Sequence, residues 1–380
     1  MRILHLAFED HRRPGSGGGS LRNREINSRL AGLGYEIDVV TTNYPGAAPR
    51  IEDSVSYRQH GLRHGYAPSL ISHQMCLPWV VARANRRTNV ELIVEEFAPL
   101  SSSLGVGHWT GTPTVGVAQG FFAEEKARQY HLPRKMLCAV QRWGTRSHPS
   151  LIAVSEDVAA RVRATSPSAT VTVIPNGVDF QAAALARARV RGTADSEPYG
   201  LFLGRLEIHQ KGLDVLLAAM THASALRRLV IAGDGKDRNQ IERAVRSRGL
   251  DDRIELVGSV HDERKWSLLA GATVLIGPSR YETFGISALE AMACGTPPVV
   301  SDLACLRELV PSSAGVHVPP EDPVALAQAI DGLVAAPARR RAMAARGQEI
   351  AEQYGWDQIA RRQAEVYDAA VRKMGPWIQV

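Results

Sequence analysis

Two basic side chains stand in the loop that follows a strand-like segment in the second half of the chain. In GLFLGRLEIHQKGLDVLLAAM the apolar run ends at Gly204, Arg205 and Lys211 follow, and Gly212 opens an apolar helix. Parallel sheets bind anionic ligands in the loops at the carboxyl ends of their strands. Arginine offers paired donors and lysine a point charge, so this loop suits a diphosphate. A solvent-exposed basic loop is the alternative.

Two glutamates accompany a second helix-like segment, PSRYETFGISALEAMACGTPPVVSD. Glu290 lies inside a helix that is apolar on nearly every side, where an unpaired carboxylate would cost about 2 to 5 kcal/mol. It therefore needs a partner, either sugar hydroxyls or one of the many arginines. Glu282 lies just before the helix and could equally be a surface charge. Phe284 and Gly285 place backbone N–H groups at the helix N-terminus, which favours phosphate oxygens.

A glycine cluster near the N-terminus, RRPGSGGGSLRNREIN, resembles a dinucleotide-binding fingerprint read as Gly15-x-Gly17-x-x-Ser20. An NAD-dependent oxidoreductase needs these glycines directly after the first strand and an acidic residue at the end of the second. Here residues 9–14 intervene, and the second strand ends in Thr-Thr-Asn at 41–43. The cluster therefore indicates a phosphate other than that of a dinucleotide cofactor.

The elements that position these residues alternate between short apolar runs and longer helical patterns, which is typical of parallel sheets built from βαβ units. We predict an α/β protein of two doubly wound, Rossmann-like domains, at 1–182 and 199–355, with an Ala/Arg-rich linker at 183–198 and a C-terminal helix at 356–380. The predicted strands are 2–8, 36–42, 91–97, 113–120, 150–155, 170–175, 199–204, 227–233, 253–260, 272–278, 297–302 and 315–319.

Composition narrows the class of protein. Among the 380 residues, 44% are hydrophobic and 22% charged, and there is no uninterrupted apolar run of about 18 residues that could span a membrane. Charges at Glu9 and Asp10 argue against a secretory signal. The four cysteines form no C-x-x-C pair, so we expect neither disulfides nor a zinc site. We therefore expect a cytoplasmic protein.

The net charge of +6 favours phosphate-bearing ligands or peripheral contact with an anionic membrane, or simply reflects solvated helices. No nucleic-acid-binding motif is present, so nucleic acid is not an expected partner.

Together these motifs resemble the retaining GT-B glycosyltransferases of family four. The matching segments are dense between 151 and 360 and sparse before that, and they are Ser155 in SLIAVSEDVAARV, Asn176-Gly177-Val178-Asp179, Gly204-Arg205, Lys211-Gly212, Gly233-Asp234-Gly235, Glu282-Thr283-Phe284-Gly285, Glu290-Ala291 and the closing YGWDQIA. The resemblance implies two domains facing a cleft, with the nucleotide-diphosphate sugar held by the second domain and the C-terminal helix crossing back onto the first.

The resemblance also implies roles. Arg205 and Lys211 would neutralise a UDP- or GDP-linked diphosphate, and Glu290 would bind the ribose hydroxyls. Glu282 would contact the sugar hydroxyls, while the amides around Phe284 and Gly285, with Gly233, would complete the donor site. Transfer would proceed with retention, and the developing charge on the leaving group would be stabilised electrostatically. No D-x-D motif occurs, so we expect neither a metal nor a cofactor.

One position departs from the family. Where its members commonly carry a histidine at the end of a first-domain strand, VGVAQGFF has Gln119. A glutamine can hydrogen-bond a sugar hydroxyl but cannot exchange a proton as imidazole does. Either the histidine acts by position, or His108 or another group replaces it. Gln119 joins Glu282, Arg205 and Lys211 as the candidate catalytic residues.

The first domain is expected to bind the acceptor. In the family arrangement the glycines form a flexible loop whose backbone approaches the donor, with Ser20 capping a helix from Leu21. This assigns donor contacts to Gly17, Gly18 and Gly19. Candidates on the acceptor side are Asp10, His11, Arg12, Glu95 and Glu96. For the last two, a solvated strand end is the alternative.

Two further functions are alternatives to a transferase, and the class of acceptor is left open. A nucleotide-sugar epimerase would share the nucleotide site but need no separate acceptor. A non-catalytic nucleotide-sugar binding protein would fit the absence of the histidine. For a transferase, the acceptor is a small molecule such as an antibiotic core, a glycan, or a lipid.

Overall fold

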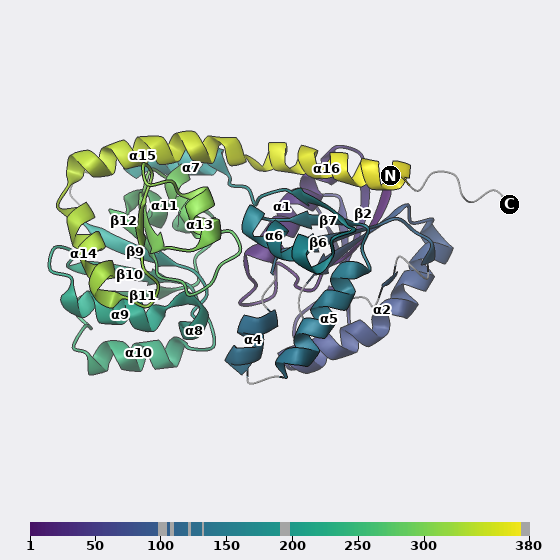
Figure 1. The fold of residues 1–380 in the computed structure, drawn as a ribbon, viewed down its shortest axis with the longest axis horizontal. Coiled ribbons are helices and arrows are strands. Elements are labelled where there is room, and N and C mark those ends of the chain that lie inside the picture. Colours follow the sequence, from purple (N-terminus) through teal and green to yellow (C-terminus); the bar gives the residue numbers. More distant parts are fainter. Residues whose placement is uncertain (98–104, 107–109, 121–122, 131–132, 191–197, 374–380) are drawn as a thin grey trace. The chain divides into compact units, whose positions relative to one another are not determined.

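The computed structural model describes residues 1–97, 105–106, 110–120, 123–130, 133–190 and 198–373. The chain forms two compact units (Figure 1). The first comprises Met1–Asn176 together with the segment from Trp356, and the second comprises Gly177–Gly355. The two α/β series expected from the sequence are therefore present, each with its own sheet.

An eight-stranded sheet organises the described part of the first unit, in the order β3-β4-β2-β1-β5-β6-β7-β8. All neighbours are parallel except β3 and β4, which pair antiparallel. Its strands are β1 Arg2–Leu6, β2 Glu36–Thr42, β3 Arg50–Glu52, β4 Val55–His60, β5 Leu92–Phe97, β6 Thr114–Ala118, β7 Ser150–Ala153 and β8 Thr170–Val173. The sequence analysis missed β3, which has only three residues, and β4, which is largely polar. The other six strands are confirmed.

The helices described in the first unit include the one formed at the C-terminal end of the chain. They are α1 Gly18–Gly32, α2 Tyr66–Thr88, α4 Ala123–Tyr130, α5 Arg134–Arg146, α6 Glu156–Thr165 and α16 Trp356–Lys373. Trp356, Ile359 and Tyr367 of α16 are buried in the same apolar cluster as Ile3, Ile26 and other residues of β1 and α1. The expected return of the C-terminal helix to the first domain is confirmed.

A six-stranded parallel sheet organises the second unit, in the order β11-β10-β9-β12-β13-β14. Its strands are β9 Tyr199–Leu203, β10 Arg228–Ala232, β11 Ile254–Gly258, β12 Val274–Gly277, β13 Pro298–Ser301 and β14 Val316–Val318. All six were predicted. This order, with the chain winding outward in both directions from β9, is that of a doubly wound Rossmann-like sheet.

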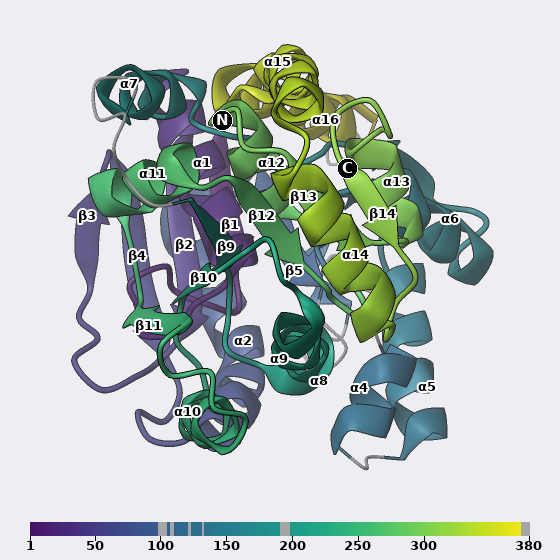
Figure 2. The same cartoon turned by 90° about the vertical axis from the view of Figure 1, so that its left-hand side faces the viewer.

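Helices cover both faces of the second sheet: α9, α10 and α14 lie on one side and α7, α11 and α12 on the other (Figure 2). The helices are α7 Phe180–Val190, α8 Ile208–Lys211, α9 Leu213–His222, α10 Arg238–Ser247, α11 Asp262–Gly271, α12 Ile286–Ala293, α13 Ala304–Leu309, α14 Pro323–Val334 and α15 Pro337–Ala351, followed by a 3-10 turn at Glu352–Tyr354. Helix α7 occupies the first half of the segment predicted as a linker at 183–198, and the second unit begins before it, at Gly177. Residues 191–197 lie outside the described part.

A buried arginine anchors the points at which the chain leaves and re-enters the first unit. Arg22 of α1 is 1% exposed and donates to Pro175 O at 2.5 Å, Asn176 Oδ1 at 3.2 Å and Gln363 Oε1 at 2.7 Å. Burial lowers the pKa of its guanidinium to about 10. Helix α1 is thereby tied both to the segment before Gly177 and to α16.

Candidate functional site

In the second unit, the loops after β9 and β10 lie backbone against backbone. Gly204 N–H donates to Ala232 O at 3.0 Å, and Leu206 N–H donates to Asp234 O at 2.9 Å. A Cβ on Gly233, whose φ is +145°, would lie 1.8 Å from Gly204 O. Only glycine fits there. The motif Gly233-Asp234-Gly235 thus fixes the path of the loop that carries Arg205.

The structure brings together two of the predicted site residues, which are 71 positions apart in the sequence. Lys211 Nζ forms an ion pair with Glu282 Oε1, and Ser279 Oγ donates to the same oxygen at 2.9 Å. The Lys211 and Glu282 side chains keep 18% and 15% exposure, so both remain accessible to a ligand. Ser279 was not among the residues predicted for the site.

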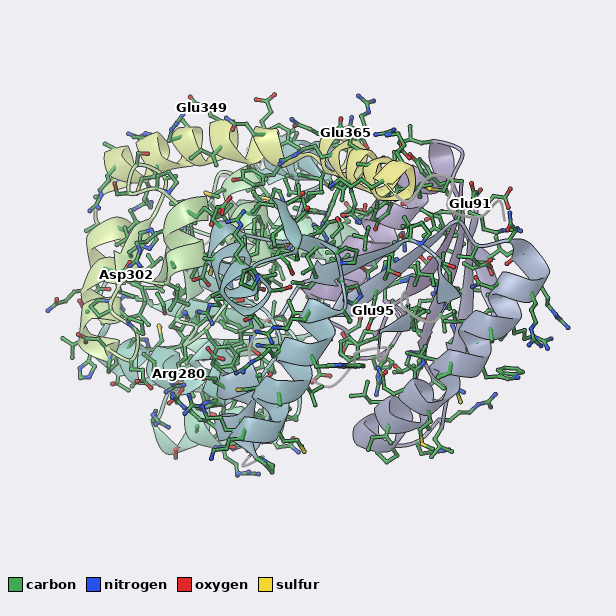
Figure 3. All side chains as sticks on the ribbon, turned by 45° about the vertical axis from the view of Figure 1, so that its right-hand side comes forward. Glu91, Glu95, Arg280, Asp302, Glu349 and Glu365 are labelled. Carbon is green, nitrogen blue, oxygen red and sulfur yellow. The ribbon has the colours of Figure 1, made fainter. Side chains whose placement is uncertain are left out.

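Arg280, labelled in Figure 3, joins the loop that carries Ser279 and Glu282 to α8. Its guanidinium pairs with Asp214 Oδ2 at 2.8 Å and Glu321 Oε1 at 2.7 Å. It also donates to the carbonyl oxygen of Ile208 at 3.2 Å. The hydrogen bonds of Arg280 to backbone carbonyls of α8 therefore tie the helix that ends at Lys211 to the loop that carries Glu282, while its ion pairs reach α9 and the segment before α14.

Arg205 differs from Lys211 in having no acidic side chain as a partner among the described residues. Its side chain is exposed, and it forms no ion pair or hydrogen bond with any residue in the described part of the chain. A guanidinium in this state can bind an anionic ligand without first breaking a protein contact. The solvent-exposed basic loop considered from the sequence thus holds for Arg205 but not for Lys211.

Glu290 is buried in α12, as predicted, and its partner in the structure is a lysine rather than an arginine. The carboxylate is 6% exposed, and Lys265 Nζ of α11 lies 2.6 Å from Oε1. The same ammonium group lies 4.1 Å from the centre of the Trp266 ring. Lys265 was not identified from the sequence, because nothing there showed which basic side chain of α11 faces α12.

The N-terminus of α12 is available to an anion. Gly285 is the N-cap residue, with φ +96°, and a Cβ there would lie 2.5 Å from Leu306 Cδ2. The Phe284 side chain is 4% exposed and faces Tyr354, with ring centroids 6.0 Å apart. The N–H groups of Phe284 and Gly285 donate to no described residue. The phenyl group is therefore part of the core, and only the backbone is left to bind phosphate.

In the first unit, the last two glycines of the cluster, Gly18 and Gly19, begin a helix and do not belong to a flexible loop. Helix α1 begins at Gly18 with Gly17 as its N-cap, and Gly17 N–H donates to Glu9 Oε2 at 3.1 Å. Ser20 is the third residue of the helix, and its hydroxyl donates to Gly17 O at 2.7 Å. The prediction that Ser20 caps a helix from Leu21 is thus wrong, because glycine takes the cap position. The N–H groups of Gly18 and Gly19 donate to no described residue.

Gln119 lies directly beside this helix N-terminus. Its Nε2 is 3.3 Å from Gly19 O and 3.1 Å from Asn23 Oδ1, and it also contacts Glu96 Oε1. The other oxygen of Glu96 accepts from Phe8 N–H at 3.2 Å. Burial raises the pKa of Glu96 to about 7. The alternative of a solvated strand end is wrong for this residue, since Glu96 is a buried carboxyl that contacts Gln119. His108 lies outside the described residues.

Glu95, the neighbouring candidate, is engaged elsewhere. Its Oε2 lies 3.0 Å from His148 Nε2, with both side chains at most 2% exposed. His148 Nδ1 lies 2.8 Å from Gly144 O. Burial lowers the pKa of His148, but the hydrogen bond that His148 donates to Glu95 outweighs this effect, so the pKa of His148 is raised overall. Figure 3 labels Glu95, in the second half of β5, and Glu91, which directly precedes this strand. Glu95 is therefore also not a solvated strand end, and its carboxylate belongs to a buried ion pair.

The three acceptor-side candidates before the glycines belong to an ion network with β3 and β4. Asp10, which is 1% exposed, pairs with Arg50 at 2.8 Å and accepts from Gln59 at 2.8 Å. Burial raises the pKa of Asp10, but the bonds from Arg50 outweigh it and lower the pKa overall. His11 and Arg12 contact Glu52 at 3.2 and 3.0 Å. Asp10 thus fastens the loop to the sheet edge, and this role could not be predicted because β3 was missed.

Ionisation of Glu96 should destabilise the fold. A carboxyl whose pKa is raised by folding contributes stability below its usual pKa, and that contribution is lost as the pH rises through about 7. We compare the free energy of unfolding of Glu96→Gln with that of the wild type at each pH. This difference should be about 1 to 3 kcal/mol more favourable to the variant at pH 8 than at pH 5, because only the wild type pays for ionisation of Glu96. Thermal unfolding of both proteins across this range measures it; parallel pH curves would contradict the burial-driven shift.

Other classes of site were sought over the described residues. Within them, no group of three or more His, Cys, Asp or Glu side chains could hold a metal ion. No described helix combines the length and the apolar character needed to cross a bilayer. All four cysteines are free thiols, as expected.

Comparison with known families and structures agrees with this geometry. The family model "Glycosyltransferase Family 4" matches residues 16–182, and "Glycosyl transferases group 1" matches residues 187–350. An uncharacterized glycosyltransferase of Methanocaldococcus jannaschii is 28% identical, over 94% of this chain and 96% of that protein. Further curated relatives match more locally, over 50% to 61% of their own length.

Solved structures of similar fold cover the whole chain. Sucrose-phosphate synthase from Thermosynechococcus elongatus superposes with a TM-score of 0.87 and 25% identity, over 98% of this chain and 99% of that one. Anabaena HepE in complex with UDP-glucose superposes with a TM-score of 0.77 and 19% identity, over 97% of this chain and 100% of that one. With both family models matched in chain order and two Rossmann-like sheets present, the chain belongs to the GT-B glycosyltransferases of family 4.

Proposed function

We propose that the chain is a retaining, metal-independent glycosyltransferase that moves a sugar from a UDP- or GDP-linked donor to an acceptor hydroxyl. The observation that carries the proposal is the pairing of Lys211 with Glu282 in the loop next to α12. The accessible cation of Lys211 can bind a diphosphate, and the accessible carboxylate of Glu282 can accept hydrogen bonds from sugar hydroxyls.

The donor would bind by exchanging these contacts. Lys211 moves from Glu282 to the diphosphate, joined by Arg205 and by the N–H groups of Phe284 and Gly285. Glu282 then accepts hydrogen bonds from the sugar hydroxyls. Glu290 binds the ribose through the carboxylate oxygen that does not contact Lys265, and Gly233 keeps the adjoining loop close. On this proposal, the ion pair between Lys211 and Glu282 opens when the donor binds.

The reaction would follow a front-face course. The bond between the anomeric carbon and the diphosphate oxygen breaks while the acceptor oxygen bonds to the same face of that carbon. The acceptor's proton passes to the leaving diphosphate, so no protein base is required. Lys211, Arg205 and the N-terminus of α12 stabilise the negative charge that develops on the leaving group.

The first unit would supply the acceptor side and close contacts to the donor. Gly18 and Gly19 offer unused N–H groups at the start of α1, with Gly17 as its cap, and Gln119 offers a polar group beside them. His11 and Arg12, which are less deeply buried than Asp10, remain acceptor contacts in this proposal. Asp10, Glu95 and Glu96 would act by holding the surrounding structure.

Among the acceptor classes, a lipid has specific support. Helix α2 exposes Ile71, Met75 and Trp79 on one stripe, at 61%, 78% and 60% exposure. The stripe continues into exposed Arg83 and Arg87, and α2 contains no acidic residue. An apolar stripe followed by cations suits the surface of an anionic membrane. A cytoplasmic enzyme working at that surface could reach a lipid acceptor.

The test is release of UDP or GDP from candidate sugar nucleotides, with and without acceptors that include lipids in anionic vesicles. UDP-glucose, the ligand named for HepE, is the first donor to try. We expect release that depends on acceptor. Conversion of the sugar nucleotide without acceptor would indicate an epimerase, and tight binding without turnover would indicate a binding protein. Either result would overturn the proposal.

A further inference from the structure

The hydrogen bonds around Gln119 do not balance. Its Nε2 faces three acceptors, Gly19 O at 3.3 Å, Asn23 Oδ1 at 3.1 Å and Glu96 Oε1, but an amide nitrogen carries only two hydrogens. In addition, Asn23 Nδ2 is buried and forms no well-aligned hydrogen bond with a described residue, although its proximity to Glu96 lowers the pKa of that carboxyl. One of the three acceptors around Gln119 Nε2 therefore receives no hydrogen from it, and Asn23 Nδ2 has a hydrogen without a well-aligned acceptor. Buried polar groups are normally paired, so the imbalance indicates a second arrangement.

Protonation of Glu96 provides that arrangement. The amide groups of Gln119 and Asn23 can turn by half a rotation and exchange oxygen for nitrogen within nearly the same space. A neutral Glu96 then donates its O–H to Gln119 Oε1, and Asn23 Nδ2 donates to the same oxygen. Asn23 Nδ2, which is unpaired in the observed arrangement, then has an acceptor. With Glu96 ionised, only the observed arrangement is possible, because a carboxylate must face Nε2.

The atom that Gln119 turns away from Glu96 faces the start of α1. In the observed arrangement this is Oε1, which lies 2.9 Å from the position of a Cβ on Gly19. After the rotation it is the NH2 group. The N–H groups of Gly18 and Gly19 at this point are already donors without a described partner. A hydroxyl that accepts from them needs an acceptor for its own proton, and in the observed arrangement Gln119 Oε1 supplies one.

The groups around Glu96 place the titration of its carboxyl near neutral pH. Burial raises its pKa to about 7, Glu9 adds to the rise, and Asn23, Phe8 N–H and Arg22 oppose it. Tyr367 of α16 is the other titratable group that faces it, and burial together with this carboxylate raises the pKa of Tyr367, so the phenol stays neutral. Glu96 is therefore the group of this cluster that changes charge in the neutral range.

We propose that Glu96 is a positioning residue whose protonation decides whether Gln119 presents its carbonyl oxygen or its NH2 group at the N-terminus of α1. The effect on catalysis rests on the proposed function, in which a donor-sugar hydroxyl binds there. Ionised Glu96 gives the arrangement that suits this hydroxyl, so donor binding should improve as the pH rises. One hydrogen bond to a neutral group changes KM by about threefold to tenfold.

The switch can be observed without turnover, by NMR of the full chain labelled with 15N in glutamine side chains. The Gln119 NH2 resonance is assigned by its loss in Gln119→Leu and followed between about pH 5.5 and 8.5. We expect it to shift with a midpoint near 7 in the wild type and not in Glu96→Gln. The matched control is Glu91→Gln, at the exposed opposite end of β5, which should keep the shift. A pH-independent resonance, or the same shift in Glu96→Gln, overturns the proposal.

Kinetics separate this inference from the function on which it rests. We expect KM for the donor to fall with rising pH in the wild type and in Glu91→Gln, with kcat changing less, and the dependence to vanish in Glu96→Gln. A KM profile that is identical in the wild type and Glu96→Gln overturns the switch and leaves the transferase standing. A titrating Gln119 resonance in a protein that turns over no sugar nucleotide supports the switch and counts against the transferase.

Discussion

Replacing Lys211 with alanine is expected to lower kcat/KM for the sugar-nucleotide donor at least tenfold, equivalent to about 1.4 kcal/mol of lost transition-state stabilisation. Two effects combine. The diphosphate loses a cation at the point where charge develops as the sugar leaves. Glu282, whose Oε1 is held by Lys211 and Ser279, also loses its charged partner and is no longer fixed for the sugar hydroxyls.

The matched control for Lys211 is Arg243→Ala, which removes a cation from the exposed side of α10 in the same unit. It should leave the kinetic constants within about twofold, because surface charges away from a site act weakly. Glu282→Gln separates the two effects: it keeps the cation for the diphosphate but weakens binding of the sugar. Unchanged kinetics in both Lys211→Ala and Glu290→Ala would refute the donor-site assignment.

The second large effect concerns the residue that follows Lys211. Gly212 has φ +64° and ends α8 while beginning α9. A Cβ at this position would lie 2.0 Å from Pro278 O, and neither backbone can yield without moving a site loop. We expect Gly212→Ala to lower the free energy of unfolding by about 4 kcal/mol or more. Chemical denaturation with a far-ultraviolet signal measures it.

Gly249 supplies the control for this substitution. It has nearly the same backbone conformation, φ +63°, but nothing lies within 4 Å of an added Cβ. Gly249→Ala therefore carries only the cost of the left-handed conformation, about 1 to 2 kcal/mol. Similar losses in the two variants would show that the contact with Pro278 is not the cause. The difference between the losses of the two variants gives the part of the free energy of unfolding that depends on the close approach of Gly212 to Pro278.

The repeating parts of the fold could be predicted because they follow local patterns. All twelve predicted strands are present, since buried parallel strands are short and rich in Val and Ile. Strands β3 and β4 were missed because they are polar and pair at the sheet edge, and their stability depends on contacts such as Arg50 with Asp10. No periodicity in the sequence reports such a contact.

The site was predictable in its residue types but not in its pairings. The burial of Glu290 followed from the apolar helix around it, yet its partner, Lys265, depends on how α11 packs on α12. The start of α1 was misplaced because serine is usually a better N-cap than glycine, whereas here Gly17 takes that position. The buried carboxyl of Glu96 looked like an exposed strand end, since burial of its side chain arises only when α1 and β6 flank it.

The contacts of Arg22 have a consequence for how the protein matures during synthesis. The first unit is discontinuous, because its core includes Trp356 and Tyr367 from α16, which leave the ribosome only after the whole second unit. Until then Arg22 lacks Gln363, and the apolar surface of α1 has no cover. The second unit is continuous in sequence, so its core needs nothing from α16. The unit whose synthesis begins first is thus completed last, because a chain that stops before α16 contains the strands of both sheets but lacks part of the core of the first unit.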